Sequence, residues 1–96
     1  MPKSSHRHIN NIKRFRMEKG LTQRELARIM GYQSVSSLSH LENGRKLPAL
    51  KTALKLEIAL QRFIGDIFPK LYEEVRARVA GRRVALFGKR EGKTTP

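Results

Sequence analysis

Apolar residues recur at helical spacing along the first two thirds of this chain, in short segments that end at glycines. In the first segment, Ile9, Ile12 and Phe15 are three residues apart, and the pattern stops at Gly20. Such a stripe predicts one buried helix face, and glycine suits the residue after a helix end because it tolerates positive φ. The pattern predicts a first helix over about residues 9–19.

Thr22 and Glu25 mark the start of a second helix. A threonine followed three residues later by glutamate is the capping-box pattern, in which each side chain bonds the other residue's backbone N–H. The segment predicts a helix over about residues 22–30 that ends at Gly31. Its apolar face consists of Leu26, Ile29 and Met30.

A third apolar stripe begins after a polar turn. Tyr32, Gln33 and Ser34 follow Gly31 and supply turn chemistry, and Asn43 and Gly44 end the stripe. This pattern predicts a third helix over about residues 34–43. The residues expected to face the core are Val35, Leu38 and Leu41.

Prolines mark the next two helix starts. Pro48 is placed where proline is favoured, in the first turn of a helix, and predicts a helix as far as about Arg62. The residues of this helix expected in the core are Leu50, Leu54, Leu56 and Leu60. A short helical turn at residues 64–68 precedes Pro69, which opens a fifth helical region with apolar residues four apart, namely Leu71, Val75 and Val79.

The last segment has no clear helical pattern. Beyond Gly81 the chain is basic and holds one apolar run, residues 84–87, for which an edge strand and disorder both remain open. We therefore expect an all-α fold with three parts: a flexible basic arm (1–8), a helical domain (9–69) and a basic C-terminal helix and tail (70–96).

Charge adds the strongest compositional signal. The chain has 96 residues, enough for one domain, and its 21 Lys and Arg against 8 Asp and Glu give a formal net charge of +13. This imbalance predicts a polyanionic partner, with nucleic acid ahead of an anionic membrane. The absence of cysteine fits a reducing compartment, and no window approaches the ~20 apolar residues of a membrane span. We expect a cytoplasmic protein with no membrane partner.

Catalysis and metal binding have little support in the sequence. There is no phosphate-cradling glycine loop and no nucleophile motif, and the few carboxylates are scattered among basic residues. His6 and His8 alternate like metal ligands but lack a cysteine or carboxylate nearby. We expect no enzyme, no cofactor and no metal site.

The two helices around Gly31 have the layout of a DNA-binding helix-turn-helix. The segments GLTQRELARIMG, SSLSHLENG and LPALKTALKLEIAL closely resemble the Cro and phage-repressor type, or Xre family, over about residues 12–68. The resemblance implies five packed helices and binding of double-stranded DNA with helix 34–43 in the major groove. It also implies a homodimer on a palindromic site.

Individual contacts follow from the same resemblance. Gln23 matches a position that contacts a phosphate, although a helix cap without a ligand is the alternative. Four residues, Val35, Ser36, Ser39 and His40, match positions aimed at base edges and nearby phosphates, and Ser34 belongs to the same segment. Capping and solvent exposure are the alternative for the serines. The loop after this helix is expected to touch the DNA backbone through Asn43, Arg45 and Lys46.

Two further features complete the resemblance. Glu42 matches a glutamate that pairs with an arginine of the first helix, and Arg16 stands at the matching place, so we expect a structural ion pair. Between Gly31 and Glu42 the chain has one residue more than the common family spacing. We place this insertion near Gln33, where it lengthens the turn and shifts the start of the third helix.

The two ends leave several functions open. The arm, with Lys3, His6 and Arg7, is either a groove-tracking segment or a solvated tail. Residues 70–96 either add nonspecific phosphate contacts or form a dimer seam. The function expected is sequence-specific DNA binding by a transcriptional repressor. The alternatives are a DNA-binding antitoxin, whose basic tail wraps a toxin or other protein partner, and a nonspecific nucleic-acid-binding protein.

Overall fold

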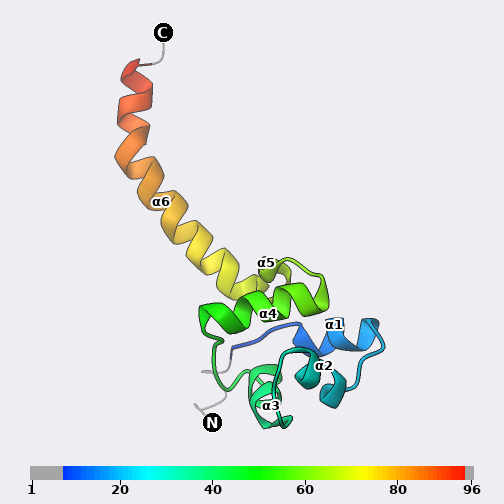
Figure 1. Ribbon diagram of the computed structural model, residues 1–96. Coiled ribbons are helices and arrows are strands. Elements are labelled where there is room, and N and C mark those ends of the chain that lie inside the picture. Colours follow the sequence, from blue (N-terminus) through cyan, green and yellow to red (C-terminus); the bar gives the residue numbers. More distant parts are fainter. Residues whose placement is uncertain (1–7, 95–96) are drawn as a thin grey trace.

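A computed structural model describes residues 8–94 of the chain, and the side chains of residues 8–88. The described part consists of helices without any strand, which confirms the all-α fold class (Figure 1). In chain order the helices are α1 (Ile12–Glu18), α2 (Gln23–Ile29), α3 (Ser36–Glu42), α4 (Leu50–Leu60), α5 (Ile64–Ile67) and α6 (Pro69–Thr94).

Helices α1 to α5, here called the body, surround one small hydrophobic core. Every helix of the body contributes buried side chains, whereas none of the described side chains of α6 is among the core residues. Burial of these side chains in the body is the main favourable term in folding. The core residues are Ile12, Phe15, Leu26, Ala27, Met30, Leu38, Leu41, Leu56, Leu60, Ile67 and Phe68.

The prediction for the buried face of α4 is half wrong. Leu56 and Leu60 are fully buried, but Leu50 is 76% exposed and Leu54 is 49% exposed. At about 100° per residue, Leu50 and Leu54 share a face with Ile58, and the centre of this face is about 140° from the centre of the buried pair. Because α4 carries leucines on more than one face, spacing alone did not identify the core side.

The predicted start of α2 and the predicted ends of the first three helices agree with the backbone, whereas α1 begins at Ile12, three residues later than predicted. Thr22 accepts a hydrogen bond from the Glu25 amide at 3.0 Å, and the Glu25 carboxylate accepts one from the Thr22 amide at 2.8 Å, which completes the capping box. Gly20, Gly31 and Gly44 all have positive φ, as expected of residues that follow a helix.

Helix α6 extends much further than the sequence indicated. Residues 84–87 lie inside it, so the expectation of an edge strand or disorder there is corrected. Gly81 weakens a helix by about 1 kcal/mol, but the surrounding Ala, Arg and Leu are good helix formers. The helix leaves the body after its first turns and projects into solvent (Figure 1). Within the described residues, no helix combines the length and apolar character needed to cross a membrane.

The segment before α1 is attached to the end of α3. The His8 amide donates to the Gly44 carbonyl at 2.7 Å, and the Asn10 side chain donates to the carbonyls of His8 and Leu41. The chain therefore enters the body beside the loop that follows α3. Residues 1–7 of the predicted arm, with Lys3, His6 and Arg7, lie outside the described residues.

Candidate nucleic-acid interface

An ion pair between Arg16 and Glu42 joins α1 to the end of α3. The Arg16 Nε donates to a Glu42 carboxylate oxygen at 2.7 Å, and its Nη1 donates to the Leu21 carbonyl at 2.8 Å. The exposed fractions of the two side chains are only 11% and 3%. A pair this buried fixes the orientation of the two helices, because either charge would be left in a poorly solvated site if its partner were removed.

Gln23 belongs to the same hydrogen-bond network. Its side-chain amide donates to the Glu42 carboxylate at 3.0 Å and is partly buried. Gln23 therefore links α2 to α3 and, through Glu42, to Arg16 on α1. In this structure the side chain is oriented toward Glu42 of the same chain. A phosphate contact would either use the remaining hydrogen-bonding atoms of the Gln23 side chain or require another rotamer.

One face of α3 and its C-cap carries four of the nine residues that the sequence placed at the DNA. Ser36, His40 and Asn43 are spaced by four and three residues, so they lie on one side of the helix, with Ser39 beside them. Ser36 and His40 are exposed, while Leu38 and Leu41 on the opposite side are fully buried. Asn43 lies within hydrogen-bond distance of the Ser39 hydroxyl, at 3.4 Å.

Ser34 and Val35 lie before α3 instead of inside it. The helix begins at Ser36, two residues later than predicted. Ser34 Oγ lies 3.1 Å from Ser36 Oγ and 3.4 Å from the Ser36 amide, so Ser34 forms hydrogen bonds with the first residue of the helix. Val35 is half-buried and packs against the core.

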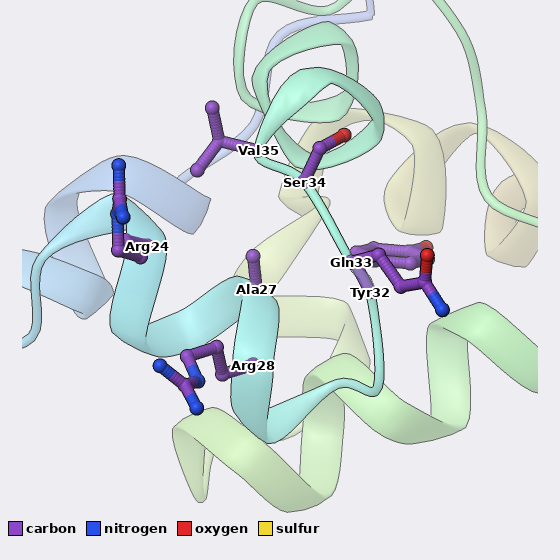
Figure 2. A pocket seen from close by; sticks show the side chains of 7 residues that line it. All are labelled: Arg24, Ala27, Arg28, Tyr32, Gln33, Ser34 and Val35. Carbon is purple, nitrogen blue, oxygen red and sulfur yellow. The ribbon is translucent and has the colours of Figure 1, made fainter.

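A hollow of about 530 Å³ separates α2 from this turn. Figure 2 shows Arg24 and Arg28 on α2 at one side of it, and Gln33, Ser34 and Val35 along the chain that leads into α3. Both arginines are exposed and form no ion pair among the described residues. The sequence prediction did not include them as site residues, although two arginines four apart on the exposed side of α2 were a usable signal.

Arg45 and Lys46 extend the positive surface past the end of α3. Both are exposed, and neither forms an ion pair within the part of the chain that the structure describes. The Arg45 amide donates to the His40 carbonyl at 2.9 Å, which holds the loop against the last turn of the helix. Glu42, the acidic residue nearest in sequence, is neutralised by Arg16. The exposed face of α3 is thus bordered by cations whose charge is not neutralised by a described carboxylate.

Known proteins resemble this chain in sequence and in fold. Residues 12–62 match the family model described as helix-turn-helix. A crystal structure of the clp gene regulator ClgR from Corynebacterium glutamicum is similar over 88% of this chain and 87% of its own. The sequence identity to ClgR is 27% and the TM-score is 0.56. No curated protein matches the chain.

Proposed function

We propose that this chain, which belongs to the helix-turn-helix family of the Cro and phage-repressor type, binds double-stranded DNA at a specific sequence. It regulates transcription, with α3 in the major groove. The observation that carries the proposal is the exposed face of α3 with cations at both ends. Arg24 and Arg28 lie on the α2 side, and Arg45 and Lys46 follow the helix.

The residues divide into two roles. Ser36, Ser39 and His40 read base edges, because hydroxyls and imidazole can donate or accept hydrogen bonds in the major groove. The second group contacts phosphates, which position the protein without reading sequence. This group consists of Gln23, Arg24, Arg28, Ser34, Asn43, Arg45 and Lys46. Val35 packs against a thymine methyl with the part of its side chain that is exposed.

The mechanism we propose is occupancy of a promoter, which represses transcription without a cofactor or a catalytic step. The similar structure is of a gene regulator, and this likeness supports a regulatory role here. Residues 9–69 carry DNA binding, the chain acts as a homodimer on a palindromic site, and it works in the cytoplasm. Residues 70–96 serve assembly of the dimer.

Selection from a random library of DNA duplexes tests sequence specificity. The purified protein is washed at about 150 mM and about 300 mM salt, because phosphate binding weakens steeply with salt while preference among sequences persists. We expect a palindromic motif with half-sites about one helical turn apart. If no sequence is enriched and binding falls uniformly with salt, the proposal is wrong, and nonspecific nucleic-acid binding or an antitoxin role replaces it.

A matched pair of variants separates base reading from phosphate contact. His40→Ala should cost about 1–3 kcal/mol on the selected sequence and relax the preference at one base position. Lys46→Ala should weaken binding to all sequences alike and reduce the salt slope by about 1. Both side chains are exposed, so both variants should keep the wild-type melting temperature. Equal losses on all sequences for His40→Ala would contradict its reading role.

A further inference from the structure

The hollow between α2 and the turn before α3 has the size of a site for a small organic molecule. Its volume is about 530 Å³, and pockets that bind small ligands have roughly 300–1,000 Å³. Helix α2 forms one wall, and residues 32–35 form the other (Figure 2). The kind of ligand that fits follows from the side chains of these two walls.

Two arginines without a protein partner make one wall of the hollow positive. Arg24 and Arg28 are one helical turn apart, both are exposed, and neither side chain forms an ion pair or a hydrogen bond within the described part of the chain. A guanidinium binds a phosphate through two parallel N–H donors, and two guanidiniums bind the same group more tightly than one. This wall therefore favours a ligand that carries a phosphate.

The remaining lining of the hollow suits a flat ring with polar edges. Ala27 is 2% exposed, and Tyr32 and Val35 are half-buried and pack against the core, so these three side chains supply apolar surface. Figure 2 shows Ala27 between the two arginines of α2. Gln33 is exposed, and its amide, which both donates and accepts hydrogen bonds, has no partner among the described residues. An aromatic base that covers the apolar side chains would bring its polar edge to this amide.

We propose that the hollow binds a nucleoside monophosphate, with the phosphate between Arg24 and Arg28 and the base against the apolar lining beside Gln33. Both halves of such a ligand are needed for a good fit. Inorganic phosphate would leave the apolar lining exposed to water, and a nucleoside without phosphate would leave both cations without an anion. The site therefore prefers the complete nucleotide to either of its parts.

A nucleotide in this hollow would exclude DNA from part of the proposed interface. Arg24, Arg28 and Ser34 line the hollow and also belong to the group proposed above to contact DNA phosphates. A guanidinium whose donors are taken by one phosphate is lost to another, and two phosphates at the same place repel each other. The inference rests on the proposed function, and it adds a ligand that lowers the occupancy of the promoter.

An NMR titration of the full chain tests nucleotide binding in the absence of DNA. The probes are AMP, GMP, CMP and UMP at constant salt, with adenosine and inorganic phosphate as controls. We expect at least one nucleotide to shift the amide signals of Ala27, Tyr32 and Gln33 with a dissociation constant of about 1 mM or tighter, and both controls to bind at least about tenfold more weakly. Because the chain has a formal net charge of +13, anions bind it weakly at many places, so the position of the shifts decides. If no nucleotide shifts these signals, or if inorganic phosphate shifts them equally well, the inference is wrong.

Three variants separate the hollow from the general attraction of charge. Arg28→Ala should weaken nucleotide binding about tenfold, and Gln33→Ala should weaken it several-fold because the base loses its hydrogen bond. Arg14→Ala is the matched control, since it also removes one exposed arginine but lies on α1 outside the hollow, and it should leave the dissociation constant unchanged. All three side chains are exposed, and the amide spectra show directly whether each variant keeps its fold. An equal loss for Arg14→Ala and Arg28→Ala would assign the binding to net charge alone and overturn the inference.

Competition with DNA tests the regulatory part of the inference. For a fluorescent duplex, a nucleotide at about ten times its dissociation constant should raise the apparent dissociation constant of the DNA about tenfold, and adenosine at the same concentration should not. An unchanged affinity for DNA with the hollow occupied would overturn this part. Nucleotide binding without selection of any DNA sequence would overturn the proposed function alone. Selection of a DNA sequence with no nucleotide in the hollow would overturn this inference alone.

Discussion

The body and helix α6 differ in what holds each helix in place. The helices of the body have 4 to 11 residues, lengths at which an isolated helix is marginal in water. They persist because they share a core, which includes all the fully buried side chains described. Helix α6 has 26 residues and little contact with the body beyond its first turns. Short helices here depend on tertiary packing, and the long one depends mainly on the helix propensity of its residues.

The largest expected effect is a core truncation, which tests whether stability resides in the body. Leu38→Ala should cost about 2–5 kcal/mol of unfolding free energy, because Leu38 is fully buried on α3. Val84→Ala removes apolar atoms from a side chain of α6 that is 67% exposed and should cost less than about 0.5 kcal/mol. Urea titration measures both. Equal losses would mean that α6 belongs to the cooperative unit of the body.

Removal of the buried ion pair should have the next largest effect. Arg16→Ala leaves the Glu42 carboxylate without its cation and should cost about 3 kcal/mol. Arg14→Ala is the matched control, since its pair with Glu18 is on the surface and is worth about 0.3–0.5 kcal/mol. Thermal unfolding at neutral pH compares the two. A loss for Arg16→Ala as small as that for Arg14→Ala would show that the pair does not organise the body.

Alanine substitutions at two glycines separate the cost of a positive φ from the cost of a steric contact with a neighbouring segment. Gly31 and Gly44 both have positive φ, but only Gly44 has a neighbour where a Cβ would be, with the His8 carbonyl oxygen 2.7 Å away. Gly31→Ala should cost about 1 kcal/mol for the conformation alone. Gly44→Ala should cost roughly 2 kcal/mol, because the segment at His8 must also move. If the two variants unfold at the same urea concentration, the contact with His8 contributes nothing.

The smallest expected effect is a gain of stability in α6. A Cβ added at Gly81 would meet no atom within 4 Å. Gly81→Ala should favour the helix by about 0.5–1 kcal/mol, raise the helical circular dichroism signal on mild heating, and leave the melting of the body unchanged. A higher melting temperature of the body would be the unexpected result, because it would couple the two regions.

The predictable features of this fold are local ones. The capping box at Thr22 and the positive φ of three glycines depend on residues adjacent in sequence, and all are present. The buried face of α4 was half wrong because Leu50 and Leu54 follow the same spacing as the residues actually buried. That choice depends on which neighbours pack against the helix. The length of α6 was missed because no core contact supplies a pattern beyond residue 80.

In the candidate site, too, some features could be predicted from the sequence and others depend on the three-dimensional structure. The Arg16 and Glu42 ion pair, expected from the family resemblance, is formed in the structure. The start of α3 was predicted two residues too early, since Ser34 and Val35 belong to the segment that leads into the helix. Arg24 and Arg28 were overlooked because an exposed cation on a helix is common. Only their three-dimensional position beside the turn links the two arginines to the proposed DNA interface.

The hydrogen bond from His8 to Gly44 has a practical consequence for handling the protein. Any peptide joined ahead of His8 starts beside the loop that carries Arg45 and Lys46. If Arg45 and Lys46 contact DNA as proposed, an affinity tag at the amino end would compete with DNA for this surface, and a histidine tag would add charge to it below neutral pH. Under the same proposal, a fluorescent dye attached at this end would report DNA binding, because DNA bound at the loop would change the surroundings of the dye.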